Sequence, residues 1–151
     1  MSDIETALAF VEALANLRSL LFAPGSDERK LRRALESEAD AVVADLEDAV
    51  ADDAKAAARD LVVSILREHS GACAVCVRIN GVDTDLWEDD LAALEGLPLD
   101  AIVVPKATPE AVEALGSSGP PLLAIVETAQ GLRLAYETAR SPRVASKVKA
   151  R

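Results

Sequence analysis

The sequence is poor in features that would point to several common classes of protein. Only 3 % of its 151 residues are aromatic, so alanine, leucine and valine must fill the interior. No apolar run approaches the length of a membrane span, and the opening Met1–Glu5 lacks the basic start of a signal peptide. The net charge of −10 provides no basic stripe for nucleic acid or an anionic membrane. These absences predict a cytoplasmic protein without nucleic-acid or membrane partners.

Cysteine, histidine and glycine-rich motifs are also scarce. Cys73 and Cys76 look like half of a redox or metal motif. Residues three apart along a strand point to opposite faces, however, so we expect two buried structural thiols. The single histidine, His69, is expected as a cation at a helix C-terminus. No GxGxxG or GxxxxGK[ST] motif occurs, so a glycine-rich nucleotide-binding turn is not predicted.

The sequence does contain a repeated pattern in which a short apolar run stops at polar residues. Its main example, Ala41–Val50, reads Ala-Val-Val-Ala-Asp-Leu-Glu-Asp-Ala-Val, which predicts a strand buried on both faces and ending in three carboxylates. Four further runs share this layout: Ser19–Ala23, Ala74–Val77, Ala101–Val104 and Leu122–Val126. In three of these four, as in the first, a charge lies at the C-terminal end. That regularity indicates one functional face.

Helical patterns separate the apolar runs. We expect helices at about 27–38, 52–69, 85–95, 108–116 and 128–141, behind an amphipathic helix at residues 2–16. Helical spacing predicts that three of these helices turn the following apolar faces inward: Leu31, Ala34 and Leu35; Trp87, Leu91 and Leu94; and Leu132, Ala135, Tyr136 and Ala139. Five strands alternating with five helices predict an α/β fold with a parallel sheet, and residues 143–151 show no sixth strand. An open doubly wound sheet and a (β/α)8 barrel both fit this order. The barrel explains the charges better, because catalytic groups gather at the C-terminal mouth of a barrel.

Five segments, in this order and spacing, resemble the citrate lyase β-subunit (CitE-like) branch of the HpcH/HpaI aldolases. They are Arg18–Gly25 (Arg-Ser-Leu-Leu-Phe-Ala-Pro-Gly), Ala39–Val50, Val77–Gly81 (Val-Arg-Ile-Asn-Gly), Val104–Lys106 (Val-Pro-Lys) and Ile125–Thr128 (Ile-Val-Glu-Thr). The resemblance implies a TIM (β/α)8-type barrel, of which this chain would hold about five βα units. Residues 1–17 would then be an N-terminal amphipathic helix, and residues 18–151 a partial barrel domain.

The resemblance also implies an activity. As a member of this family, the protein would be a Mg2+-dependent carbon–carbon lyase. It would cleave a 3-hydroxyacyl-CoA thioester, of the citryl-CoA or malyl-CoA class, to an acyl-CoA and a ketoacid. Two alternatives stay open. One is a metal-dependent aldolase acting on a free 2-keto-3-hydroxy acid, and the other is a catalytically silent fragment that only binds ligand or subunits.

Site residues follow from the same resemblance. Arg78 matches the arginine that holds the substrate carboxylate, and Glu127 matches the glutamate that ligates the metal; these two would be catalytic. Glu47 and Asp48 match an acidic pair near the metal and its waters, and Lys106 matches a lysine with an electrostatic role. All five would contact substrate.

The residues alone allow plainer interpretations of the same positions. Arg78 could neutralise the acids at a strand end, and Glu127 could be a helix-start acid. Lys106 could be a solvated charge or a Schiff-base lysine. Lys55 would serve the start of a helix, although it is also found in the family.

The sequence departs from the family pattern at its end. The resemblance implies a sixth strand that ends in a Gly-x-x-Asp motif, whose aspartate is the second metal ligand. Ser146–Arg151 stands there instead, so we expect that ligand to be missing. A barrel of this kind takes about 250 residues, so open strand edges and exposed apolar surface are expected. We therefore predict a shortened family member that forms a homo-oligomer when well ordered.

Overall fold

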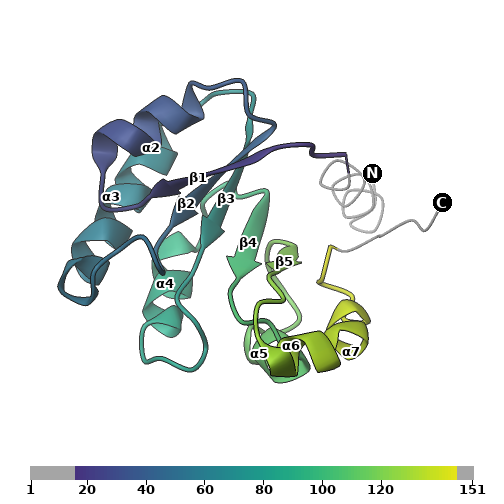
Figure 1. Cartoon of the computed structure of the whole chain (residues 1–151). Helices are drawn as coiled ribbons and strands as arrows, with labels where there is room; N and C mark the ends of the chain where they lie inside the picture. The colour runs from purple at the N-terminus through teal and green to yellow at the C-terminus, as the bar shows by residue number, and fades with distance from the viewer. Residues whose placement is uncertain (1–15, 146–151) are drawn as a thin grey trace.

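A parallel sheet forms the centre of the molecule (Figure 1). The computed structural model describes residues 16–145. The helix predicted at residues 2–16 lies almost wholly outside these residues, so the proposed boundary after residue 17 stays a prediction. The five strands pair in chain order, and all pairs are parallel. They are β1 (Leu20–Pro24), β2 (Ala41–Asp45), β3 (Ala74–Arg78), β4 (Ala101–Val104) and β5 (Leu122–Ala124).

One or two helices follow each strand. They are α2 (Glu28–Leu35), η1 (Asp52–Ala54), α3 (Lys55–Glu68), α4 (Trp87–Leu94), α5 (Pro109–Ala114), α6 (Ala129–Arg133) and α7 (Ala135–Ala139). Side-chain caps define several of their starts, because an oxygen at the N-cap satisfies an amide that has no partner within the helix. Asp27 accepts from the Lys30 amide at 2.9 Å, and Thr128 accepts from the Gly131 amide at 2.9 Å. In all of residues 16–145, no helix is long and apolar enough to cross a membrane.

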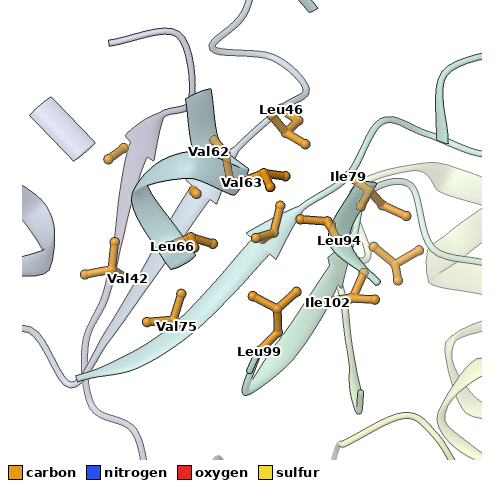
Figure 2. Close-up of a cluster of buried hydrophobic side chains, with 14 of the residues drawn as sticks. Val42, Leu46, Val62, Val63, Leu66, Val75, Ile79, Leu94, Leu99 and Ile102 are labelled. Atoms are coloured by element: carbon orange, nitrogen blue, oxygen red, sulfur yellow. The ribbon is translucent and has the colours of Figure 1, made fainter. Parts of the chain in front are cut away.

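The main core lies between the sheet and its helices. Figure 2 shows side chains from β2, β3 and β4, such as Val42, Val75 and Ile102, gathered with Val62 and Leu66 of α3. A smaller cluster lies on the opposite face of the sheet and contains Val43, Cys76, Ala101 and Val103. Alternation along each strand explains the division, because successive side chains point to opposite faces.

The two cysteines lie on opposite faces, as predicted. Cys76 is fully buried in the smaller cluster, whereas Cys73 packs against the main core. Both are free thiols. Burial raises the pKa of Cys76 to about 12, so this thiol stays protonated at neutral pH. The structural role expected for Cys76 fits this environment.

Carboxylates also organise the N-terminal edge of the sheet. Asp40 accepts hydrogen bonds from the backbone amides of Arg18 (2.8 Å) and Ser19 (3.0 Å), and from the Arg18 guanidinium (2.9 Å). The bonds from Arg18 hold the pKa of Asp40 well below its usual range. Asp100 accepts from the Val75 amide at 2.6 Å. These acids tie the start of one strand to the start of its neighbour.

The last part of the described chain differs from the prediction. β5 is shorter than expected, and Val144 forms a single parallel bridge with Leu122 although no sixth strand was predicted. One helix was expected at 128–141, but two short helices occur. Leu132 and Tyr136 were predicted to face inward, and that prediction is wrong, because they are 72 % and 74 % exposed.

The buried positions of these helices explain the error. Gly131 of α6 and Thr138 of α7 are the buried residues there. A Cβ atom on Gly131 would lie only 2.8 Å from the Ala107 carbonyl oxygen, so only glycine allows this close approach. A glycine carries no apolar side chain, and a hydrophobic pattern therefore cannot reveal it as an inward position.

Candidate functional site

A buried ion pair joins the C-terminal ends of β2 and β3. Asp45 is the last residue of β2, Arg78 is the last residue of β3, and the two are register partners. The Arg78 guanidinium donates two parallel hydrogen bonds to the Asp45 carboxylate, with Nε 2.7 Å from Oδ1 and Nη2 2.5 Å from Oδ2. Such two-pronged pairing fixes the plane of the guanidinium. The Phe22 ring lies under it, with its centroid 5.2 Å from Arg78 Cζ.

The surroundings of Asp45 keep it ionised. It is only 2 % exposed, and burial alone would raise its pKa. The hydrogen bonds from Arg78 and from the backbone amides of Glu47 (2.9 Å) and Ala49 (3.0 Å) outweigh burial and lower the pKa of Asp45. The same pairing raises the pKa of Arg78. Arg78 therefore does neutralise an acid at a strand end, as one interpretation of the sequence suggested.

Glu47 is the least satisfied group at this edge. It is 7 % exposed, with Oε2 3.3 Å from Arg78 Nη1 and Oε1 3.6 Å from Lys106 Nζ. Within residues 16–145, Oε2 is buried and accepts no hydrogen bond. Burial, followed by the neighbouring charge of Asp48, raises the pKa of Glu47. A buried carboxylate oxygen that accepts no hydrogen bond is costly even beside a guanidinium, and a water or a metal ion bound to it would offset that cost.

The turn after β4 brings Lys106 and Glu127 together. The backbone amide of Lys106 donates to Glu127 Oε1 at 2.8 Å. The ammonium of Lys106 lies 3.6 Å from Glu47 Oε1 and 3.5 Å from Asp83 Oδ2. Thr128 caps α6, so the carboxylate of Glu127 bonds the β4 turn rather than the start of this helix.

The charge state of Lys106 bears on its chemistry. Asp83 and then Glu47 raise the pKa of Lys106. A Schiff-base lysine needs the opposite shift, because its nucleophile is the neutral amine. The pKa direction supports the electrostatic interpretation of Lys106.

All five of the expected site residues thus lie along one edge of the sheet. Arg78 contacts Glu47 and, at 3.5 Å, Asp48; Lys106 contacts Glu47 and Glu127. We define the C-terminal cluster as Asp45, Glu47, Asp48, Lys55, Arg78, Asp83, Lys106 and Glu127. Its five carboxylates face three cations, a formal excess of two negative charges.

Three residues of this cluster were not predicted as site residues. Lys55 buries its ammonium, which donates to the carbonyl oxygens of Leu46 (2.9 Å) and Glu47 (2.6 Å) and so anchors the acidic turn. A lysine in the first turn of a helix opposes the helix dipole, and that was the available signal. The sequence indicated Asp45 only as a possible ion-pair partner of Arg78. Nothing in the sequence marked Asp83 as a site residue, because it lies in a segment expected only to be a polar turn.

A second buried network supports the turn after β3. Asp90 is fully buried and accepts from Arg59 Nε, the Asn80 amide and Asn80 Nδ2, each at 2.8 Å. These bonds tie α3, α4 and the residues just after Arg78 to one another. The signal was that Asp90 stands three residues after Trp87 on the side of the helix predicted to be apolar.

The donors of the C-terminal cluster fit a hard divalent cation only in part. Within residues 16–145, no three His, Cys, Asp or Glu side chains converge into a complete metal site. Mg2+ keeps several waters, however, and is usually bound through one or two carboxylates. The excess of negative charge and the Glu47 oxygen that accepts no hydrogen bond suit such an ion. Glu127 was predicted to be its ligand, and that role stays a prediction.

A cavity of about 470 Å3 opens beside the C-terminal cluster. Its lining includes Asp83, Lys106, Thr108, Glu110, Thr128 and Gln130. These residues come from the turns that follow β3, β4 and β5 and from the first turns of α5 and α6, at the end of the sheet where a barrel of this type binds its substrate.

Comparison with known proteins identifies the family. The HpcH/HpaI aldolase/citrate lyase family model matches residues 18–148. The chain belongs to this family. A (3S)-malyl-CoA thioesterase of Cereibacter sphaeroides is 44 % identical over 135 residues, covering 87 % of this chain and 47 % of the relative. An L-malyl-CoA/beta-methylmalyl-CoA lyase of the same species is 38 % identical over 145 residues, covering 84 % and 46 %.

Solved structures of the family agree with the fold. CitE from Mycobacterium tuberculosis, in complex with magnesium, acetoacetate and coenzyme A, aligns with a TM-score of 0.72 at 30 % identity, covering 85 % of this chain and 47 % of that one. The chain thus spans about half the length of the curated relatives it matches. The predicted α/β fold, an incomplete barrel of about five βα units, is confirmed.

Proposed function

We propose that this protein is a Mg2+-dependent carbon–carbon lyase of the citrate lyase β-subunit type. Its substrate would be a 3-hydroxyacyl-CoA thioester of the malyl-CoA or citryl-CoA class. One observation supports this most: Arg78 and Glu127, far apart in sequence, lie on one edge of the sheet and are linked through Glu47 and Lys106. The relatives named as malyl-CoA enzymes and the magnesium and CoA complex of CitE point to the same chemistry.

In this proposal each residue has a separate task. Glu127 would hold Mg2+, which, when bound, polarises the oxygens of the ketoacid half of the substrate. Arg78, fixed in its plane by Asp45, would pair with the substrate carboxylate. Lys106 keeps its charge because of its raised pKa and would stabilise developing negative charge. Glu47 and Asp48 would hold waters near the ion.

The reaction breaks the bond between the hydroxyl-bearing carbon and the carbon next to the thioester. The hydroxyl loses its proton and becomes the carbonyl of the ketoacid. The electron pair of the broken bond passes to the thioester half as an enolate, which takes up a proton to give the acyl-CoA. Groups that stabilise negative charge at both fragments are therefore needed, and the cations of the C-terminal cluster have that character.

A second candidate is hydrolysis of the same thioester. The 44 % identical relative named (3S)-malyl-CoA thioesterase favours it. Hydrolysis releases free CoA and the hydroxy acid, whereas lyase cleavage of malyl-CoA releases acetyl-CoA and glyoxylate. The two activities share a substrate but differ in every product.

Product analysis tests both candidates. The protein is incubated with malyl-CoA, citryl-CoA or a free 2-keto-3-hydroxy acid, with and without Mg2+, while ketoacid and free thiol are measured. Ketoacid without free thiol supports the lyase, and free thiol without ketoacid supports the thioesterase. We expect Arg78→Lys to lower turnover about 100-fold, because a single ammonium cannot pair with a carboxylate through two parallel bonds. Turnover of the free acid alone, or of nothing, contradicts the proposal.

We further propose that the protein forms a homo-oligomer. On the described part of the chain, β1 pairs only with β2, and Leu20, Leu21 and Phe22 of this strand are 41 %, 41 % and 44 % exposed. An apolar edge strand favours association. Light scattering at micromolar concentration should therefore give a mass above 15.9 kDa, and a monodisperse monomer would contradict this.

A further inference from the structure

Lys106 has an unusual backbone conformation. Its φ angle is 48°, and within residues 16–145 it is the one residue other than glycine with a positive φ. The left-handed region costs an ordinary L-residue about 1 kcal/mol, and lysine lacks the short polar side chain that makes it cheaper for asparagine. Surrounding contacts must therefore hold this turn in place, and such strained residues cluster at functional sites.

The left-handed turn directs two successive amides at the end of β5. The Lys106 amide donates to Glu127 Oε1 at 2.8 Å, and the Ala107 amide donates to the Ile125 carbonyl oxygen at 2.9 Å. From the other side, α6 packs against the turn, since Gly131 lies against the Ala107 carbonyl oxygen. The turn is held between β5 and α6, and the Glu127 carboxylate is bonded to it.

This bond restricts the orientation of the Glu127 carboxylate. Oε1 accepts from the Lys106 amide and keeps one lone pair, whereas Oε2 keeps both of its lone pairs for a cation or substrate. Hydrogen bonds from outside the ligand set orient a carboxylate ligand, and their loss typically weakens metal binding about 10- to 100-fold.

We propose that Lys106 is a positioning residue whose backbone amide, presented by the left-handed turn, aims the Glu127 carboxylate. Its ammonium has a separate role between Glu47 and Asp83. The backbone and the side chain of one residue thus act on different groups. The cation-binding part of this inference rests on the proposed function, while the aiming of Glu127 does not.

Four substitutions separate the two roles. Lys106→Gly and Lys106→Val both remove the ammonium, but glycine adopts a φ of 48° freely, whereas β-branched valine strongly disfavours it. Lys106→Gln removes the charge and keeps an unbranched side chain. Glu127→Ala removes the acceptor and leaves the turn residue intact.

The first measurement is hydrogen exchange of the residue 106 amide by NMR. We expect protection within about threefold of wild type in Lys106→Gly and Lys106→Gln, and exchange at least about tenfold faster in Lys106→Val and Glu127→Ala. The Ile102 amide, which bonds the Pro121 carbonyl oxygen across the sheet, serves as the folding control. Equal protection in Lys106→Gly and Lys106→Val, or no effect of Glu127→Ala, would overturn the proposal.

The second measurement is Mn2+ binding followed by electron paramagnetic resonance. Lys106→Gly should bind at least about tenfold more tightly than Lys106→Val, although both lack the ammonium. If wild type binds no Mn2+, the proposed metal-dependent function fails, and the exchange data still decide whether the turn aims Glu127. Equal Mn2+ affinity of the glycine and valine variants would overturn the claim that the turn positions Glu127 for a cation.

Discussion

The two ends of the sheet use carboxylates in opposite ways. At the N-terminal edge, Asp40 accepts hydrogen bonds from two backbone amides and from Arg18, and its pKa is lowered. At the C-terminal edge, Glu47 is buried with an oxygen that accepts no hydrogen bond, and its pKa is raised. Both ends carry acidic side chains, but the Asp40 carboxylate is hydrogen-bonded through both oxygens, whereas Glu47 has a buried oxygen that accepts no hydrogen bond.

This difference separates stability from function. A carboxylate that is fully hydrogen-bonded stabilises the fold, whereas a carboxylate that is buried beside another negative charge destabilises it. Functional sites commonly retain such unfavourable groups because a ligand or ion satisfies them. The strained turn at Lys106 lies at the same edge as Glu47. The N-terminal edge has the character of a structural support, and the C-terminal edge that of a binding site.

The largest expected effect tests the buried pair at the C-terminal edge. Arg78→Met leaves the Asp45 carboxylate buried without its counter-ion and should lower the free energy of unfolding by about 3–5 kcal/mol. Adding Asp45→Asn removes the stranded charge and should recover much of this loss. Urea denaturation measures both.

Arg32→Met provides the matched control for this substitution. Arg32 also pairs with carboxylates, Glu28 and Glu68, but on the exposed face of α2, so we expect no measurable change in stability. If Arg78→Met also left the free energy of unfolding unchanged, the expected difference between buried and exposed ion pairs would be contradicted.

A smaller effect of opposite sign is expected at Glu47. The raised pKa means that the folded state disfavours the charged carboxylate, so stability falls as pH rises from about 4.3, the usual value, through the folded-state pKa. Glu47→Gln should therefore stabilise the protein by about 1 kcal/mol at pH 7. The gain should disappear near pH 4. Denaturation at both pH values checks this. If Glu47→Gln destabilised the protein at pH 7, Glu47 would stabilise the fold as Asp40 does, and the two edges would not differ in this respect.

The smallest effect concerns Asp40. Its lowered pKa means that its contribution is fully present above the usual aspartate value of about 3.9 and is lost as pH falls through the folded-state pKa. Asp40→Asn should lower the unfolding midpoint at neutral pH, and the difference from wild type should shrink below about pH 4. Turnover should be unchanged. A loss of turnover in this variant would mean that the N-terminal edge also takes part in function.

Much of the architecture could be predicted because it depends on local apolar patterns. Ala101–Val104 was predicted as a strand and is β4, and Leu31, Ala34 and Leu35 were predicted to face inward from α2 and do so. Here periodicity and burial coincide. Leu132 and Tyr136 failed because the buried positions of α6 and α7 are a glycine and a threonine.

The site was predicted less completely, for a physical reason. Arg78, Glu47, Lys106 and Glu127 were found through the resemblance, and the structure brings them to one edge, while their roles stay predictions. The left-handed turn at Lys106 could not be predicted, because lysine gives no sign of a positive φ. Buried contacts such as that of Lys55 with two carbonyl oxygens depend on tertiary packing.

The most direct test of the central claim is a Mn2+ titration of wild type, Glu127→Ala and Asp40→Asn, with Mg2+ as competitor. Each variant removes one carboxylate, from opposite edges of the sheet. We predict saturable binding to wild type and to Asp40→Asn that Mg2+ displaces, and affinity at least about tenfold weaker in Glu127→Ala. Equal affinity in all three proteins would contradict the assignment of the cation site to the C-terminal edge.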